Sequence, residues 1–145
     1  MVRYRADRVF TGSEMLTPGE VVVDGDRVAS VGVARDEEAP DGVETIDLGD
    51  VVIAPGLVDV HNHGGGGVSF AEDARAAARL HRRFGTTSVV ASLVTQDVEV
   101  LEGQVRALAP LVRDGGLAGI HLGGPWLAEA YKGAHPPEKL RDPEP

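Results

Sequence analysis

A buried β-strand that ends in two histidines is predicted by the stretch Ala54-Pro55-Gly56-Leu57-Val58-Asp59-Val60-His61-Asn62-His63. This strand is the strongest indication of the fold of the chain. Side chains alternate along a strand, so Asp59, His61 and His63 are expected on one face. Alternate residues lie roughly 6.5 to 7 Å apart, a separation from which two imidazole nitrogens can reach one metal ion at about 2.0 to 2.1 Å. We therefore predict that His61 and His63 are metal ligands.

The sequence on the C-terminal side predicts an α/β fold with a parallel sheet. After about residue 50, short apolar runs alternate with helical patterns, which is typical of βα units. A capping box at Ser69–Glu72 begins the first expected helix, and Gly85 ends it. The second helix is expected from about Asp97 to Leu108, with Pro110 producing a kink or a further turn. The expected strands cover residues 51–53, 57–60, 87–94 and 117–122.

The histidine pair is followed by four glycines, Gly64–Gly67. A phosphate-binding loop would continue with Lys and Ser or Thr, which are missing here. We interpret the run as flexible backbone close to the histidines. An apolar parallel strand followed by such a loop indicates the catalytic face of a barrel, where hydrolytic metals are commonly held. His81, in the middle of the first expected helix, is assigned no function.

The first fifty residues predict a small antiparallel unit of short strands. Asp24-Gly25-Asp26 separates the valine-rich runs Glu20–Val23 and Arg27–Val33. This is a strong hairpin signal, because glycine tolerates the positive φ that tight turns need. The acidic residues from Asp36 to Asp41 are interpreted as a solvated loop without a function.

Composition excludes several classes of function. The chain has 145 residues, of which 42% are hydrophobic, and this content favours a globular protein over a disordered one. Its formal net charge of -9 argues against nucleic acid, whose phosphates attract basic surfaces. No apolar run of about 18 residues and no signal-peptide core is present, so we expect no membrane association and a cytoplasmic protein. Because the chain has no cysteine, any metal must take histidine or carboxylate ligands.

A second motif begins at the end of the last expected strand, with His121-Leu122-Gly123-Gly124-Pro125-Trp126, and continues to Lys132-Gly133-Ala134-His135. Together with residues 51–67, this motif resembles the N-acetylglucosamine-6-phosphate deacetylases of the amidohydrolase superfamily. His-x-His at a first strand occurs in many amidohydrolases, whereas the Gly-Pro-aromatic and Lys-Gly-Ala-His arrangement is particular to this family. The resemblance covers nearly the whole chain. Trp126 is interpreted as packing rather than as stacking on a sugar.

For the fold, the resemblance implies the N-terminal portion of a metal-dependent hydrolase (β/α)8 barrel. Residues 53–145 would form its first three βα units, and residues 1–52 would contribute strands to a small β-sandwich. Since such a barrel takes about 250 residues, it is expected to be incomplete in this chain. The complete enzyme is expected to be a homo-oligomer.

For the function, the resemblance implies a metal-dependent amide hydrolase that converts N-acetylglucosamine 6-phosphate to glucosamine 6-phosphate and acetate. His61 and His63 would bind one or two divalent ions such as zinc or iron, and Ala134 and His135 would contact the amino-sugar phosphate. Gly123 occupies the position where the family has a glutamate ligand. The remaining metal-binding histidines and the catalytic aspartate are expected beyond Pro145. No catalytic residue is therefore assigned, and this chain alone is expected to be inactive.

Two alternatives stay open at this point. One is another amidohydrolase, of the dihydroorotase or cytosine deaminase type, although the loop from Gly124 to His135 argues against it. The other is a non-catalytic remnant, which the glycine at position 123 and the missing strands suggest.

Overall fold

The computed structural model describes residues 1–35, 38 and 40–143. The chain divides into two compact units, residues 1–55 and 56–145. The boundary expected after residue 52 falls inside the first of these units, because Val52–Ile53 pairs there with Arg8–Val9.

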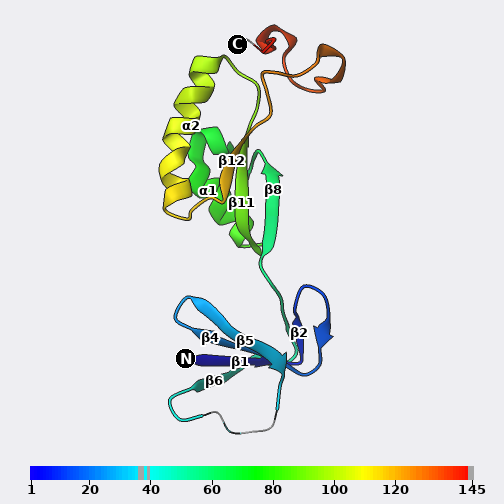
Figure 1. Cartoon of the computed structure of the whole chain (residues 1–145), viewed down its shortest axis with the longest axis vertical. Helices are drawn as coiled ribbons and strands as arrows, with labels where there is room; N and C mark the ends of the chain where they lie inside the picture. Colours follow the sequence, from blue (N-terminus) through cyan, green and yellow to red (C-terminus); the bar gives the residue numbers. More distant parts are fainter. Residues whose placement is uncertain (36–37, 39, 144–145) are drawn as a thin grey trace. The chain divides into compact units, whose positions relative to one another are not determined.

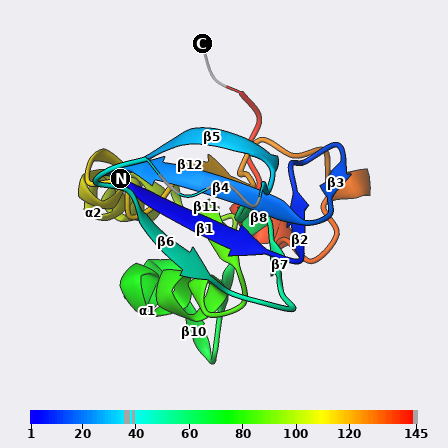
Figure 2. The ribbon, with the colours of Figure 1, turned by 90° about the horizontal axis from the view of Figure 1, so that it is seen from below.

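The described residues of the N-terminal unit form seven short strands. They are β1 (Val2–Ala6), β2 (Arg8–Phe10), β3 (Met15–Leu16), β4 (Gly19–Asp24), β5 (Arg27–Val33), β6 (Glu44–Asp47) and β7 (Val52–Ile53). One sheet has the order β5-β4-β1-β6, which can be followed in Figure 2, and a second has the order β3-β2-β7. The expected antiparallel pattern holds for β5-β4-β1 and for β2-β3, whereas β6 and β7 are each added in parallel.

The hairpin expected in this unit is confirmed. β4 and β5 pair antiparallel, with Asp24 opposite Arg27, and the turn residue Gly25 has a φ of +59°. A positive φ is accessible to glycine at little cost because it has no Cβ. Of the expected acidic loop, residues 36, 37 and 39 lie outside the described residues.

The C-terminal unit alternates parallel strands with helices. Its strands are β8 (Leu57–Asn62), β9 (Gly64–Gly65), β10 (Val68–Ser69), β11 (Thr86–Leu93) and β12 (Gly119–Leu122), and its helices are α1 (Phe70–Arg82), α2 (Val98–Arg113) and the 3-10 turns η1 (Glu129–Tyr131) and η2 (Pro137–Lys139). The sheet has the order β12-β11-β8, and both neighbours of β11 run parallel to it. The expected α/β class is therefore confirmed.

The core of this unit lies between the sheet and the two helices, which pack beside it in Figure 1. Small alanines on α1 bring the helix close to the sheet, and larger side chains come from Phe70 at the start of α1, from β11 and from α2. Because Val89, Ala91 and Leu93 face this core, strand alternation directs Ser92 to the opposite face of the sheet. The buried core residues are Phe70, Ala74, Ala77, Ala78, Val89, Ala91, Leu93, Leu101, Leu108 and Leu117.

The expectation that the strand before the histidines is buried is wrong. Within the described part of the chain, β8 is an edge strand that pairs only with β11. Val58 and Val60 are 67% and 68% exposed, since α1 packs mainly against β11 and α2 against β12. The strand is apolar in sequence, but a sequence pattern does not reveal whether a neighbouring element covers it.

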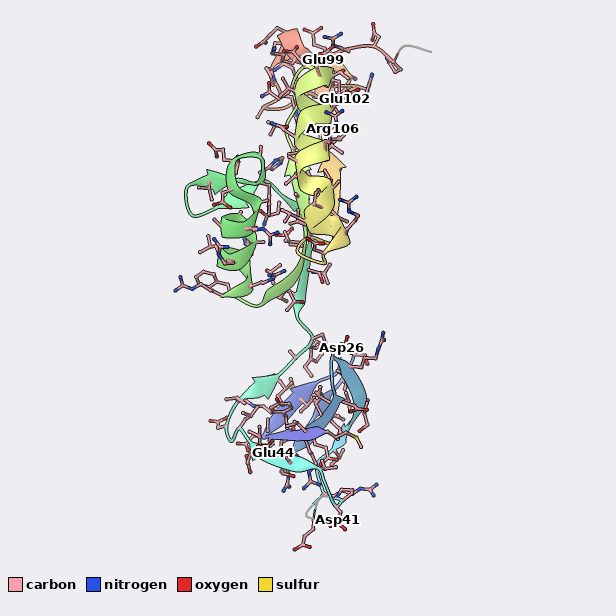
Figure 3. The ribbon with its side chains drawn as sticks, turned by 90° about the vertical axis from the view of Figure 1, so that its left-hand side faces the viewer. Asp26, Asp41, Glu44, Glu99, Glu102 and Arg106 are labelled. Atoms are coloured by element: carbon pink, nitrogen blue, oxygen red, sulfur yellow. The ribbon has the colours of Figure 1, made fainter. Side chains whose placement is uncertain are left out.

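Helix α2 is longer than expected, because it continues through Pro110 to Arg113. Proline removes one backbone N–H and thus one intrahelical hydrogen bond, yet the amide of Asp114 still donates to the Pro110 carbonyl at 2.9 Å. The helix ends just before Gly115, whose φ is +71°. Glu99, Glu102 and Arg106 lie along its exposed side (Figure 3), where Glu102 and Arg106 form an i,i+4 ion pair at 3.8 Å.

Helix α1 begins with the expected capping box. The Ser69 hydroxyl accepts the N–H of Glu72 at 3.2 Å, and a Glu72 oxygen accepts the N–H of Ser69 at 2.8 Å. Hydrogen bonds from the backbone and side chain of Ser69 lower the pKa of Glu72. Ionised Glu72 therefore stabilises the fold above its ordinary pKa, and this contribution is lost as the pH falls through the lowered pKa.

A second cap inside α1 leads to a stability prediction. Asp73 has non-helical φ and ψ, and its Oδ1 accepts the N–H of Ala76 at 2.9 Å, so it caps the longer part of the helix. We expect Asp73→Ala to lower the free energy of unfolding by about 1 kcal/mol, and Ser69→Ala to lower it less. Urea unfolding of the two variants measures both values. An equal loss, or a larger loss for Ser69→Ala, would contradict this assignment of the caps.

Candidate metal site at the ends of the parallel strands

The two histidines of the opening stretch lie together at the C-terminal end of β8. Their Nε2 atoms are 3.1 Å apart, and their ring centroids are 5.1 Å apart in an edge-on arrangement. The nitrogen separation is close to that of two donors that share one ion at about 2.0 to 2.1 Å. Both side chains are exposed, and both belong to the donor types that zinc and similar ions accept. The arrangement of the His61 and His63 nitrogens is thus compatible with both binding one metal ion.

A third imidazole, that of His121, lies beside them. Its ring centroid is 5.0 Å from that of His61. His121 lies on β12 in register with Ser92 of β11, and its Nδ1 is 3.2 Å from the Ser92 hydroxyl. Sequence reasoning did not assign His121 a place in the site. The signal that could have found it is the shared edge at which parallel strands end. Across the described ranges, no group of three or more His, Cys, Asp or Glu side chains could hold a metal ion.

Asp59 is oriented toward the backbone rather than toward an ion. Its Oδ1 accepts the N–H of His61 at 3.1 Å, and its Oδ2 accepts a hydrogen from Nδ2 of Asn62 at 2.6 Å. The bond from Asn62, followed by that from the His61 amide, lowers the pKa of Asp59. Asn62 in turn accepts the N–H of Gly64 at 2.9 Å. Both carboxylate oxygens of Asp59 therefore serve to shape the end of β8.

The glycine run after His63 forms a tight hairpin of β9 and β10. Gly66 and Gly67 both have positive φ, +66° and +85°, which a two-residue turn of this kind requires. His81 of α1 donates from Nε2 to the carbonyl of Gly64 at 3.0 Å. The run thus forms a hairpin turn whose Gly64 carbonyl is hydrogen-bonded to α1, and His81 has a structural contact.

His135 lies beside Gly123. Its Nδ1 faces both the hydroxyl of Thr95, at 2.6 Å, and the amide N–H of Thr95, at 3.4 Å. Because the amide can only donate, Nδ1 acts as the acceptor, and Nε2 carries the hydrogen of the neutral ring. Thr95 is fully buried, so the bond is shielded from water. Ala134 is exposed next to His135 in the loop.

The backbone around Gly123 is crowded. A Cβ added there would lie 3.0 Å from Cε1 of His135 and 3.1 Å from the carbonyl oxygen of Leu93. The amide of Gly123 donates to that same carbonyl at 2.9 Å. A side chain at this position therefore requires His135 or the backbone to move by a few tenths of an ångström.

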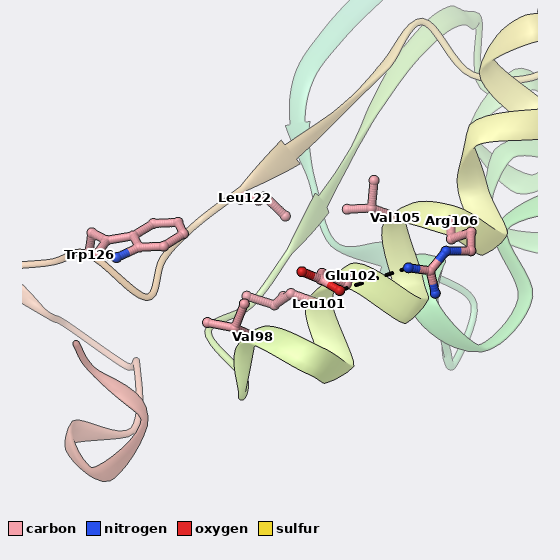
Figure 4. Close-up of a pocket in the computed structure, with 7 residues that line it drawn as sticks. All are labelled: Val98, Leu101, Glu102, Val105, Arg106, Leu122 and Trp126. Carbon is pink, nitrogen blue, oxygen red and sulfur yellow. Dashed lines mark ion pairs between the residues drawn. The ribbon is translucent and has the colours of Figure 1, made fainter. Parts of the chain in front are cut away.

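A hollow of about 430 Å³ lies elsewhere on the unit, between α2 and the end of β12 (Figure 4). Apolar side chains make up most of its wall, and the Glu102–Arg106 pair borders it. Trp126, expected to be packed, lines this hollow and is half exposed. None of the histidines takes part in it. Its lining residues are Val98, Leu101, Glu102, Val105, Arg106, Leu122 and Trp126.

Among the helices of the described chain, none is long and apolar enough to cross a membrane.

No family model matches the sequence. Solved structures of known proteins are similar to this chain. The structure of N-acetyl-D-glucosamine-6-phosphate deacetylase from Mycobacterium smegmatis is 44% identical, with a TM-score of 0.89 over 99% of this chain and 38% of that one. A mutant of that enzyme in complex with N-acetyl-D-glucosamine-6-phosphate is 45% identical, with a TM-score of 0.86 and the same coverage.

A curated relative gives the same result. The N-acetylglucosamine-6-phosphate deacetylase of Bos taurus is 32% identical over 97% of this chain and 37% of its own length. The parallel α/β unit and these matches show that the chain belongs to the amidohydrolase family. Within that family, it is related over nearly its whole length to the N-acetylglucosamine-6-phosphate deacetylases. It spans less than two fifths of the length of these relatives.

Proposed function

We propose that this chain is the part of an N-acetylglucosamine-6-phosphate deacetylase that supplies the first two histidine ligands of its metal site. The observation that carries the proposal is the convergence of the His61 and His63 Nε2 atoms, 3.1 Å apart, at the end of a parallel strand. The similarity to deacetylases along nearly the whole chain supplies the reaction and the substrate class.

The fold proposed for the complete protein is a (β/α)8 barrel. In support, β8, β11 and β12 lie in chain order in one parallel sheet, and a helix connects each to the next. The C-terminal unit would be the first three βα units, with the N-terminal strands forming part of a small β-sandwich. The histidines would then lie at the catalytic face.

The chemistry proposed is hydrolysis of the acetamide group. A bound divalent ion, such as zinc or iron, polarises a carbonyl and lowers the pKa of bound water. His61 and His63 would hold one or two such ions. His135, kept by Thr95 as an Nε2–H donor, would donate a hydrogen bond to the amino-sugar phosphate beside Ala134. No described residue is assigned as the general base.

Two features favour this reading over the alternatives. The Lys132–His135 loop, which the resemblance treats as particular to these deacetylases, is folded so that His135 lies at Gly123, in the loop that follows β12. A non-catalytic remnant would not need to keep the imidazoles of His61, His63 and His121 together. The glycine at position 123 nevertheless implies that the chain, as it stands, binds metal weakly.

The proposal is tested with a chimera in which this chain replaces the matching segment of the Mycobacterium smegmatis deacetylase and carries Gly123→Glu. We expect metal-dependent release of acetate from N-acetylglucosamine 6-phosphate, and no hydrolysis of dihydroorotate or cytosine. The unmodified enzyme is the positive control, and circular dichroism verifies folding. A folded, metal-loaded chimera that releases no acetate would rule out the proposal.

A further inference from the structure

The hydroxyl of Ser92 connects all three strands of the parallel sheet at the histidine cluster, which we define as His61, His63 and His121. Ser92 lies on the central strand β11 and is only 3% exposed. Its Oγ accepts the N–H of Asn62 from β8 at 3.2 Å and lies 3.2 Å from Nδ1 of His121 on β12. One buried hydroxyl thus contacts both flanking strands.

The direction of each hydrogen bond follows from the groups involved. A backbone amide can only donate, so Oγ is the acceptor toward Asn62. A buried hydroxyl hydrogen also needs an acceptor, and Nδ1 of His121 is the one that the described residues offer. Ser92 therefore donates to His121, which places the hydrogen of the neutral imidazole on Nε2, at the other edge of the ring.

The contact between Ser92 and β8 lies next to an irregularity in the pairing of β8 with β11. The register between β8 and β11 shifts between Val89 and Ala91, next to the position of His61. Near this irregularity, the Asn62 amide donates to the side-chain hydroxyl of Ser92. Asn62 is the residue between His61 and His63, so the hydroxyl fixes the backbone from which both imidazoles project.

We infer that Ser92 is a positioning residue of the histidine cluster, which orients His121 against His61 and sets the backbone between His61 and His63 for metal binding. The inference rests on the metal role proposed above for the histidine pair. Residues that support metal ligands typically contribute about 10- to 100-fold to metal affinity. Ser92 would contribute to metal affinity in this way from β11, which lies between β8 and β12.

The test compares Ser92→Ala, Ser92→Thr and Ser88→Ala with the unchanged 145-residue chain. Thr keeps the hydroxyl, and Ser88 lies on the same face of the same strand without a place in the cluster. Two quantities are measured: zinc affinity by competition with a chromophoric chelator, and the ¹⁵N resonance of Nδ1 of His121 in the metal-free chain. Circular dichroism verifies that each variant is folded.

We expect Ser92→Ala to weaken zinc binding about tenfold and to move the His121 Nδ1 resonance to that of a nitrogen without a hydrogen bond. Ser92→Thr should restore both values, and Ser88→Ala should change neither. If the resonance is unchanged in Ser92→Ala, or if Thr fails to restore it in a folded chain, the inference is overturned. Absence of zinc binding in the unchanged chain would instead refute the metal role, while the resonance still tests the contact with Ser92.

Discussion

Replacing Gly123 with glutamate is expected to raise the acetate-releasing activity of the chimera by about 100-fold or more relative to a chimera that retains glycine. The resemblance places a glutamate ligand at this position, and glycine offers neither a donor atom nor a negative charge. Even loss of a supporting residue outside the ligand shell costs about 10- to 100-fold in affinity or activity, so loss of a ligand should cost at least as much.

The crowding around Gly123 makes the matched control important. Any side chain there meets Cε1 of His135 at 3.0 Å and the Leu93 carbonyl at 3.1 Å, so part of the effect of Gly123→Glu is steric. Gly123→Ala introduces the same Cβ without the carboxylate. We expect Gly123→Ala to be no more active than the glycine form, while only Gly123→Glu raises kcat/KM and the metal content measured by mass spectrometry. Equal metal content in all three proteins would remove the basis for the ligand assignment.

Removing both histidines of the pair is expected to abolish specific zinc binding by the chain. In His61→Ala combined with His63→Ala, the two nitrogens that lie 3.1 Å apart are lost. Each single substitution should weaken binding by about 100-fold or more, because one remaining imidazole cannot chelate. Equilibrium dialysis against zinc at constant pH measures the affinity and the number of ions per chain.

The control for this prediction is His81→Gln. The chain has 5 histidines. His81 lies outside the histidine cluster, and its ring is hydrogen-bonded to the carbonyl of Gly64. Glutamine keeps an N–H donor for that carbonyl, so the hairpin after His63 should persist. Zinc binding should be unchanged in this variant. Retention of full affinity by the double alanine variant would show that zinc binds elsewhere.

Local signals in the sequence predicted much of the fold. The capping box at Ser69, the hairpin at Gly25 and the parallel βα pattern each depend on residues close together in the chain, and each is confirmed. Features that depend on tertiary context could not be predicted from such signals. Val52–Ile53 has the pattern of a strand, but nothing local reveals that it pairs with Arg8–Val9 in the first unit. The exposure of β8 likewise depends on which elements pack beside it, which a local pattern does not reveal.

The same contrast between local signals and tertiary context applies to the candidate site. Strand alternation alone brings His61 and His63 to one face, and the structure has their nitrogens in contact. The contributions of Ser92 and His121 depend on the register between β11 and β12, which the sequence does not encode in any short pattern. The contact between Thr95 and His135 spans 40 residues and needs the complete loop after β12.

The most direct test of this account is the location of a zinc ion in a crystal of the 145-residue chain, found by anomalous scattering at the zinc absorption edge. We expect a peak about 2.0 to 2.1 Å from Nε2 of both His61 and His63. A peak bound to other residues, or no peak at this pair in crystals grown with zinc, would contradict it.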